Sequence, residues 1–349
     1  MRAYSLLRPL LFMLPPERAH LLALAALERR LLPERRQPVT LKVELWDLTF
    51  PNPIGVAAGF DKNAEAACGL FSLGFGFVEV GTLTPLPQPG NPQPRLFRLL
   101  EDGALINRLG FNNSGHAAAL AGLRARAASG IIGVNIGANR DSADRIGDYV
   151  KALGTFNDTA SYIAVNISSP NTPGLRALQS QKELSLLLSR LTETRRALSN
   201  PKPLLLKIAP DLSNEELADI AELSLANGID GLIISNTTLS RPSLRSSHAS
   251  EQGGLSGRPL FELSTRKLAQ FYHLTRGRLP LIGVGGVSSA ETAWQKIRAG
   301  ASLVQLYTAL IYEGPSLVRD VVEGLAQKLK ASGKNSLREI TGTGVADWL

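Results

Sequence analysis

The sequence has one cysteine and four histidines in 349 residues. The single cysteine, Cys68, cannot form an intramolecular disulfide, and no cysteine and histidine cluster has the spacing of zinc ligands. These shortages argue against a disulfide scaffold and a structural zinc site, so we predict no bound metal and a reducing compartment. Cys68 falls in a predicted helix, where we expect it to serve packing.

Long apolar runs are also missing. The longest uncharged apolar stretches near the N-terminus, Pro9–Pro16 and Leu21–Leu27, are far shorter than the roughly 18–20 residues that cross a bilayer. Met1–Leu14 lacks the apolar segment and cleavage site of a signal peptide, so we expect the N-terminus to be retained. The sequence therefore predicts no membrane-spanning helix.

Charged residues make up only 19% of the chain and hydrophobic residues 44%, which is typical of a globular protein with a buried core. The net charge of +8 is unevenly distributed, because residues 1–42 carry eight Lys or Arg against three Glu. This basic segment coincides with leucine-rich amphipathic stretches and not with aromatic side chains that could stack on bases. It therefore favours contact with an anionic membrane surface, and we expect no nucleic-acid partner.

Two short helices are predicted in this basic segment, at Tyr4–Leu14 and Glu17–Leu32, separated by Pro15 and Pro16. In the second helix Leu21, Leu24, Leu27 and Leu31 recur at helical spacing. We assign residues 1–40 to an amphipathic helical hairpin and residues 41–349 to a main domain. An ordinary helix pair packed on the main domain is the alternative interpretation of the hairpin.

After a short β-like segment at Leu41–Phe50, brief apolar strands alternate with longer helical patterns. The predicted strands are Ile54–Ala58, Phe77–Gly81, Ile131–Ile136, Ile163–Ile167, Leu204–Ile208, Gly231–Ser235, Leu281–Val284 and Leu303–Leu306. The predicted helices are Ala64–Leu73, Ser114–Ala128, Ser142–Ala160, Gln181–Leu198, Asn214–Ala226, Ser264–Leu274, Ala290–Ala299 and Pro315–Ala331.

Eight such units predict an α/β fold, a (β/α)8 TIM barrel with an N-terminal two-helix hairpin. A doubly wound sheet is the alternative, but the turn Ala57–Asp61 lacks the G-x-G-x-x-G pattern that would normally follow its first strand. The Pro- and Gly-rich segment Thr82–Asn113 is too long for a simple connection, so we expect it to cover the mouth of the barrel.

Polar residues lie at or just after the C-terminal ends of the predicted strands, where such barrels carry their chemistry. They are Asp61, Lys62, Asn63, Thr82, Asn135, Asn139, Asn166, Ser168, Ser169, Asn171, Lys207, Ser235, Asn236, Thr237, Tyr307 and Thr308. Any one asparagine alone is more simply a turn residue, but their recurrence predicts a site. Gly283–Gly286 ends the seventh strand where barrels commonly bind phosphate, although it could also be only a tight turn.

Asparagine amides match the donor and acceptor edge of a pyrimidine or flavin ring, and a lysine beside a flavin stabilises the charge of its reduced form. The absence of paired carboxylates and of a histidine-rich cluster argues against glycosidase and metal-hydrolysis chemistry. Two alternatives remain open. One is a flavin-free phosphate-binding barrel, a lyase or isomerase acting on a sugar phosphate; the other is a non-catalytic peripheral membrane protein.

Five motifs together closely resemble the class 2 dihydroorotate dehydrogenases, the quinone-dependent, membrane-associated type. They are Ala57–Lys62, Asn107–Asn113, Asn166–Gly174, Gly253–Pro259 and Gly283–Gly286. The resemblance covers essentially the whole chain. It implies an FMN-dependent oxidoreductase that oxidises (S)-dihydroorotate to orotate in de novo pyrimidine (UMP) biosynthesis, with FMN as hydride acceptor and a membrane quinone as final electron acceptor.

The resemblance also implies site residues by matching motif. Ser169 would be the catalytic base that removes the C5 proton. Substrate would contact Lys62, Asn107, Arg108, Leu109, Gly110, Phe111, Asn166, Asn171, Asn236 and Thr237. FMN would contact Ala58, Gly59, Lys62, Thr82, Asn135, Asn166, Lys207, Ser235, Gly257, Gly286, Tyr307 and Thr308.

The base indicates the class, because the similar class 1 enzymes carry cysteine where this chain has Ser169. The hairpin, absent from class 1, would then give a quinone tail a route to the flavin. We expect a monomer bound peripherally to the cytoplasmic side of the cell inner (cytoplasmic) membrane. No histidine or carboxylate adjoins Ser169 in sequence to activate it, so a water, a relay through Thr172 and burial against a loop all remain open.

Overall fold

The computed structural model describes residues 3–32, 41–125, 130–172 and 174–349. Its centre is a closed barrel of eight strands that pair in parallel, which confirms the predicted fold. The barrel strands are β3 (Ile54–Val56), β4 (Phe77–Leu83), β7 (Ile131–Ile136), β8 (Tyr162–Asn166), β9 (Leu204–Ile208), β10 (Gly231–Ile234), β12 (Leu281–Val284) and β13 (Leu303–Leu306). Pairing of β13 with β3 closes the ring.

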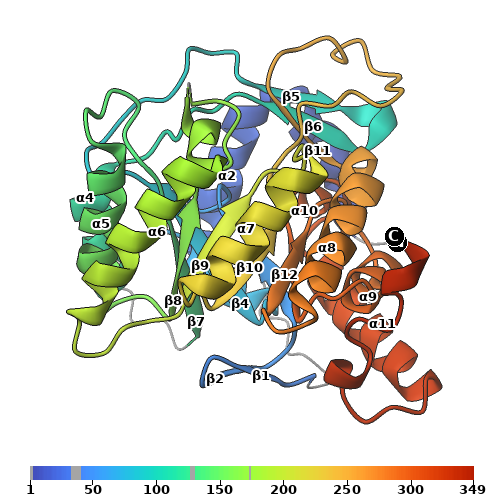
Figure 1. Cartoon of the computed structure of the whole chain (residues 1–349). Helices are drawn as coiled ribbons and strands as arrows, with labels where there is room; N and C mark the ends of the chain where they lie inside the picture. The colour runs from blue at the N-terminus through green and yellow to red at the C-terminus, as the bar shows by residue number, and fades with distance from the viewer. Residues whose placement is uncertain (1–2, 33–40, 126–129, 173) are drawn as a thin grey trace.

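Helices surround this barrel (Figure 1). They are α3 (Ala67–Ser72), α4 (Gly115–Ala125), α5 (Arg145–Phe156), α6 (Gln181–Arg196), α7 (Asn214–Ala226), α8 (Phe261–Thr275), α9 (Ala290–Arg298) and α11 (Leu317–Ala331), each overlapping a predicted helix. The end of the helix predicted at Ser114–Ala128 lies outside the described residues. The helix predicted from Ser142 begins only at Arg145, because the Asp144 carboxylate accepts a hydrogen bond from Gly147 N and caps it.

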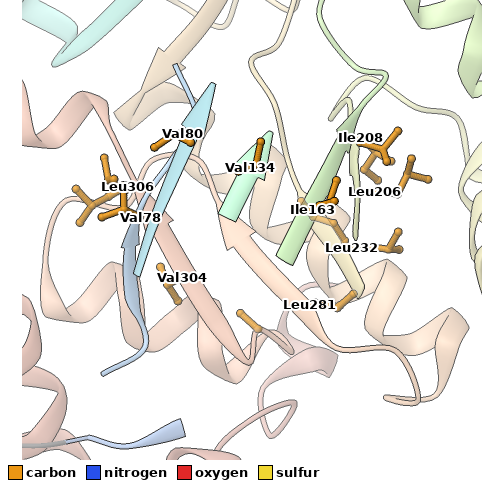
Figure 2. Packing of buried hydrophobic residues seen from close by; sticks show 14 of the residues in the cluster. Val78, Val80, Val134, Ile163, Leu206, Ile208, Leu232, Leu281, Val304 and Leu306 are labelled. Atoms are coloured by element: carbon orange, nitrogen blue, oxygen red, sulfur yellow. The ribbon is translucent and has the colours of Figure 1, made fainter. Parts of the chain in front are cut away.

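Successive side chains along each barrel strand point to opposite sides, so they form two apolar layers, one facing the helices and one inside the barrel. Val78, Val80 and Val134 point outward toward the helices, as do Ile163, Leu206, Ile208, Leu232, Leu281, Val304 and Leu306 (Figure 2). The intervening residues fill the barrel interior, where Phe77 and Tyr162 are fully buried. Two strand glycines make room for these rings, because a Cβ at Gly55 would lie 2.4 Å from Phe77 and one at Gly133 would lie 2.1 Å from Tyr162.

The two ends of the barrel are closed differently. At one end lies a hairpin of β1 (Val43–Leu45) and β2 (Leu48–Phe50), where the sequence predicted a single β-like segment; its turn residues Trp46 and Asp47 both have positive φ. At the opposite end lies an antiparallel sheet of β5 (Leu96–Leu99), β6 (Ala104–Asn107) and β11 (Gly254–Gly257) (Figure 1). This sheet belongs largely to the segment expected to cover the barrel mouth.

The N-terminal helices α1 (Ala3–Met13) and α2 (Pro16–Glu28) pack beside this covering sheet and α10 (Thr308–Glu313), a short helix that the sequence did not predict (Figure 1). Tyr4 OH donates to Ile311 O at 2.5 Å, and Arg98 donates to the carbonyl oxygen of Leu14 at 2.9 Å. The predicted leucine stripe does not form one buried face, since Leu27 is buried whereas Leu21 and Leu31 are exposed. Residues 33–40, at the predicted domain boundary, lie outside the described residues.

Candidate functional site

A cavity of about 1300 Å³, counting the space open to solvent, lies between the barrel mouth and the covering sheet. It collects most of the predicted site residues from nine separate segments of the chain. The predicted residues that line it are Ala58, Gly59, Lys62, Thr82, Asn107, Leu109, Gly110, Phe111, Asn166, Ser169, Asn171, Lys207, Ser235, Asn236, Thr237, Gly257, Gly286, Tyr307 and Thr308. Residues far apart in sequence therefore meet at one place, as their positions after the strands predicted.

Two of the site residues that the resemblance implies, Arg108 and Asn135, do not line this cavity, and neither do Asp61, Asn63, Asn139 and Ser168 from the polar strand ends. The guanidinium group of Arg108 lies over the ring of Phe97 and donates to the Glu251 carboxylate at 2.8 Å, so its side chain ties the covering segments together. Asn135 is fully buried behind Thr82, whose hydroxyl donates to Asn135 Oδ1 at 2.7 Å. A direct contact of either side chain with a ligand stays a prediction.

A buried polar chain runs from the cavity into the barrel. Asn166 Nδ2 donates to Thr82 Oγ1 at 3.0 Å, and Asn135 Nδ2 donates to Glu79 Oε1 at 2.8 Å. The fully buried Glu79 carboxylate also accepts from Tyr162 OH and Gln305 Nε2, at 2.9 and 2.7 Å. The sequence reasoning missed Glu79, although a single carboxylate at an inward position of the apolar strand Phe77–Leu83 was a signal that could have revealed it.

Lys207 projects from β9 into the same cavity, and its Nζ lies 3.7 Å from Glu79 Oε1. Burial lowers the pKa of Lys207, and the negative charge of Glu79 opposes that shift. A buried lysine needs such a partner to stay charged. The pair therefore places a cation at the floor of the cavity.

Ser169 lies in the loop after β8 and is 6% exposed. Its Oγ accepts a hydrogen bond from Asn171 N at 3.3 Å, and within the described ranges neither a histidine nor a carboxylate hydrogen-bonds to it. Thr172, in the same loop, is buried, and its Oγ1 has no hydrogen-bond partner among the described residues. The geometry thus offers a hydroxyl enclosed by the loop, with a second hydroxyl nearby in sequence.

Three asparagine side chains line the cavity near Ser169. Asn171 Nδ2 approaches Asn107 Oδ1 at 3.4 Å, and Asn236 Nδ2 donates to Ser168 Oγ at 2.9 Å. Since β6 carries Asn107, the covering sheet contributes directly to this group. Amides from three segments can pair with alternating donors and acceptors on one flat heterocycle.

Lys62 adds a second cation on the side of the cavity nearer the N-terminal helices. Burial lowers its pKa to about 8, while the Glu17 carboxylate on α2 acts in the opposite direction. Its neighbour Asp61 faces the backbone instead, because its carboxylate accepts from Glu65 N and Ala66 N at 2.8 and 2.9 Å. Because its pKa lies above neutral pH, Lys62 is largely charged there and can pair with an anionic ligand.

One wall of the cavity is formed by the backbone of three glycines, which present no side chains. Gly257, Gly285 and Gly286 have φ of +97°, +104° and +73°. A Cβ at Gly286 would lie 2.4 Å from the Cβ of Phe261, and one at Gly257 would lie 2.4 Å from Gly103 O. Only glycine satisfies both the conformation and the packing, so no side chain stands between the backbone and the cavity at these positions, as close binding of a phosphate group requires. Together with the amides and Lys207, these glycines fit a phosphorylated flavin.

Several cavity residues were not predicted from the sequence. They are Ala57, Leu96, Gly103, Leu105, Asn112, Pro170, Ser256, Arg258, Leu260, Val287, Ser288, Leu306, Ala309, Tyr312 and Glu313. Many of them belong to the covering sheet, η3 (Arg258–Leu260) or α10. The sequence does not reveal these residues because it does not predict the elements that position most of them.

A second cavity, of about 1160 Å³ on the same measure, lies between the N-terminal helices and the barrel. Its lining is mostly apolar, from Leu7, Leu11, Ala19 and Ala23 among others, and it shares Tyr307, Leu96 and Leu105 with the first cavity. His20 lies at the junction, with its ring 5.2 Å from that of Phe60. Burial lowers the pKa of His20 to about 3, so this imidazole is neutral and leaves the cavity without a charge there.

Within the residues that the structure describes, no helix is long and apolar enough to cross a membrane. No group of three or more histidine, cysteine, aspartate or glutamate side chains is arranged to hold a metal ion in the same part of the chain.

Comparison with known proteins matches this geometry to one family. A family model described as dihydroorotate dehydrogenase matches residues 40–329. The chain is 56% identical to a dihydroorotate dehydrogenase (quinone) of Parvibaculum lavamentivorans, over 99% of each chain. It is 54% identical to that of Agrobacterium fabrum, over 97% of this chain and 95% of the relative.

A solved structure of DHODH from Eimeria tenella in complex with ferulenol is similar throughout. It aligns with a TM-score of 0.91 and 39% identity, covering 94% of this chain and 95% of that one. The ligand-free form aligns with the same TM-score at 40% identity. None of these comparisons favours the sugar-phosphate alternative.

Proposed function

The chain belongs to the dihydroorotate dehydrogenase family, and on that premise we propose how its residues divide the work of the reaction. It oxidises (S)-dihydroorotate to orotate in pyrimidine biosynthesis, in a flavin-dependent reaction with a quinone as electron acceptor. The roles of individual residues, the identity of the flavin and the mode of membrane contact are our proposals.

We assign FMN to the glycine-walled part of the first cavity. The backbone near Gly257 and Gly286 would hold its phosphate, and Lys207 with Asn166 and Thr82 would hold its ring. When bound, FMN accepts the hydride from dihydroorotate and passes the electrons on to quinone. Lys207, kept charged by Glu79, would stabilise negative charge at the ring.

Dihydroorotate would occupy the side of the cavity formed by Asn107, Asn171, Asn236 and Thr237. Their amide and hydroxyl groups offer donors and acceptors for the ring edge, and Lys62 offers a cation for the substrate carboxylate. Ser169 would take the C5 proton, with the backbone around Leu109–Phe111 excluding water above it. The hydroxyl of Thr172 is buried and has no hydrogen-bond partner within the described ranges, which supports a relay of that proton out of the loop.

The second cavity would admit the quinone. Its apolar lining suits an isoprenoid tail, and its shared residue Tyr307 brings it next to the flavin part of the first cavity. Leu6, Leu10 and Met13 of α1 and Leu21 and Leu22 of α2 are largely exposed, which supports insertion of this surface into a bilayer. We propose peripheral attachment of a monomer to the cytoplasmic side of the inner membrane.

The observation that carries this proposal is the meeting of Ser169, Lys62, Lys207 and the asparagines in one cavity covered by β6. The test is stopped-flow reduction of the bound flavin by dihydroorotate without oxygen. The wild-type absorbance should bleach, and Ser169→Ala should slow the bleaching by roughly 10²–10⁴-fold, the usual effect of removing a positioned base.

The matched control is Ser332→Ala, which removes an exposed hydroxyl at the end of α11. It should bleach at the wild-type rate, and all three proteins should contain the same amount of flavin. Near-normal bleaching of Ser169→Ala would remove Ser169 from the role of base.

A further inference from the structure

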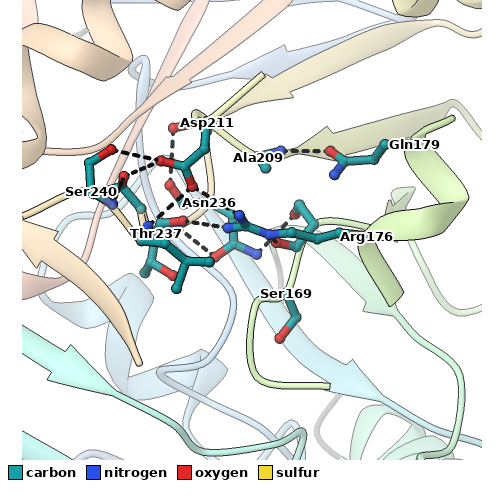
Figure 3. A network of polar contacts seen from close by, with 12 residues as sticks. Ser169, Arg176, Gln179, Ala209, Asp211, Asn236, Thr237 and Ser240 are labelled. Carbon is teal, nitrogen blue, oxygen red and sulfur yellow. Dashed lines mark hydrogen bonds and ion pairs between the residues drawn. The ribbon is translucent and has the colours of Figure 1, made fainter. Parts of the chain in front are cut away.

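The side chain of Arg176 joins three loops at the barrel mouth. It lies in the 3-10 helix η2 (Leu175–Gln179), and its Nε donates to Ser168 O at 3.1 Å. Its two terminal nitrogens donate to Asp211 Oδ2 at 2.9 Å and to Thr237 O at 3.2 Å (Figure 3). Ser168 follows β8, Asp211 follows β9 and Thr237 follows β10, so one guanidinium group connects three consecutive units of the barrel.

Asp211 anchors the far side of this contact. Besides Arg176, its carboxylate accepts from the hydroxyl of Thr238 and from Leu239 N, the latter at 3.1 Å, with Ser240 Oγ at 3.4 Å. Figure 3 shows these donors converging on the carboxylate. Asp211 therefore fixes the segment that immediately follows Asn236 and Thr237.

The same two loops also meet on the cavity side. Asn236 Nδ2 donates to Ser168 Oγ at 2.9 Å, and Ser168 Oγ donates to Asn166 Oδ1 at the same distance. The loop of Ser169 and the segment Asn236–Thr237 are thus fastened twice, by this amide facing the cavity and by Arg176 further out. Neither contact involves Ser169 Oγ itself, whose hydrogen bond is with the backbone of its own loop.

We propose that Arg176, supported by Asp211, is a positioning residue that sets the distance between Ser169 and the substrate-binding segment Asn236–Thr237. The proposal rests on the assignment of Ser169 as the base. Because no charged group among the described residues hydrogen-bonds to Ser169 Oγ, the position of this hydroxyl relative to the substrate depends on the backbone. Arg176 holds the carbonyl group directly before Ser169. A displacement of about 1 Å in such an arrangement can slow a reaction by roughly 10²-fold.

The planar guanidinium group explains why arginine is needed. It directs three donors to three fixed acceptors at once, whereas the ammonium group of lysine is a single point charge that cannot span them. Arg176→Lys keeps the charge beside Asp211 but loses this geometry. It should therefore slow flavin reduction by dihydroorotate by roughly 10–100-fold, and Arg176→Ala should slow it at least as much.

The experiment measures both half-reactions of the flavin-loaded, full-length enzyme by stopped flow. In both variants the limiting rate of flavin reduction should fall, while reoxidation of the reduced enzyme by quinone and the flavin content stay at wild-type values. Added guanidinium ion should restore part of the rate in Arg176→Ala, and ethylammonium should not. Arg190→Ala is the matched control, because it removes an exposed ion pair with Asp144 outside the cavity and should change neither half-reaction.

Reduction within about threefold of the wild-type rate in both variants would overturn the proposal. The proposal would also be overturned if both half-reactions slowed equally, the flavin content fell and guanidinium ion restored no activity, because that result would indicate general damage to the fold. Should Arg176→Ala not fold, Arg176→Lys and Asp211→Asn decide the question by the same rates. If flavin reduction is slow in Ser169→Ala but proceeds at the wild-type rate in the Arg176 variants, only the inference about Arg176 is overturned. If reduction proceeds at the wild-type rate in Ser169→Ala, the assignment of Ser169 as the base is overturned, and the inference about Arg176 falls with it.

Discussion

Lys62 is the residue through which the two cavities influence each other electrostatically. Burial lowers the pKa of Lys62 to about 8, and the carboxylate of Glu17 on α2 opposes this shift. In the second cavity, the pKa of His20 is lowered mainly by burial and further by the charge of Lys62. Glu17 itself is held by Arg95, which donates to it at 2.6 Å. The cation that would face the substrate carboxylate therefore depends on a helix outside the barrel.

This lowered pKa predicts how dihydroorotate binding depends on pH. Lys62 is charged below its pKa and neutral above it, so attraction of the substrate anion is lost as pH rises through about 8. The dihydroorotate concentration that gives half-maximal flavin reduction should rise above this pH by up to about tenfold per pH unit. Stopped-flow titrations between about pH 7 and pH 9 measure it separately from the limiting rate.

Lys62→Met is the control for that experiment. It should require a high dihydroorotate concentration at every pH and show no rise near pH 8. A half-saturating concentration of wild type that stays constant across the range would contradict the role of Lys62 as the partner of the substrate anion.

Individual site residues were predictable where they lie at or just beyond the C-terminal end of a strand, because these ends converge in a parallel barrel. Lys62, Asn166 and Lys207 were located in this way and all line the cavity. Glu79 was missed because it lies within a strand and not at its end. Arg108 adjoins a lining residue in sequence, yet its side chain packs on Phe97, a direction that sequence alone does not reveal.

At the scale of elements, buried parallel strands were the most predictable because they are short, apolar and regularly spaced. All eight appear with boundaries shifted by few residues, as in β3, which ends at Val56 where Ala58 was predicted. The covering strands β5, β6 and β11 were not predicted, because they lie in Pro- and Gly-rich sequence and the partner of β11 is distant in sequence. β6 pairs with β11 across almost 150 residues, as in Asn107 with Gly254.

The helices α1 and α2 lead to a prediction about membrane binding. Leu6 and Leu10 on α1 are each 63% exposed. Exposing two large apolar side chains to water is unfavourable, so this surface suits contact with a bilayer. The double variant Leu6→Asp and Leu10→Asp should lose flotation with anionic lipid vesicles, because it removes apolar burial and adds charge that the lipids repel.

The control for flotation is Leu186→Asp, which alters a leucine on α6 that is 51% exposed. It should still float, and flavin reduction by dihydroorotate should be normal in both proteins. Flotation of the double variant at the wild-type level would refute attachment through α1.

At the scale of the whole molecule, two cavities meet at Tyr307. One lies over the barrel and carries polar groups and cations; the other lies under the N-terminal helices and is mostly apolar. This division matches the two half-reactions of the enzyme, because dihydroorotate is an anionic heterocycle and the quinone is an apolar molecule. We propose that each half-reaction uses its own cavity and that the flavin lies between the two cavities.

The most direct test is to narrow the second cavity and measure both half-reactions in the same protein. Ala23 of α2 lines that cavity and is remote from the residues of the first, so Ala23→Phe should leave reduction of the flavin by dihydroorotate unchanged. Reoxidation by a long-tailed quinone should slow by about tenfold or more, the effect of losing about 1.4 kcal/mol of binding free energy. Unchanged reoxidation in a flavin-loaded Ala23→Phe protein, or an equal slowing of both half-reactions, would contradict the separation of the two cavities.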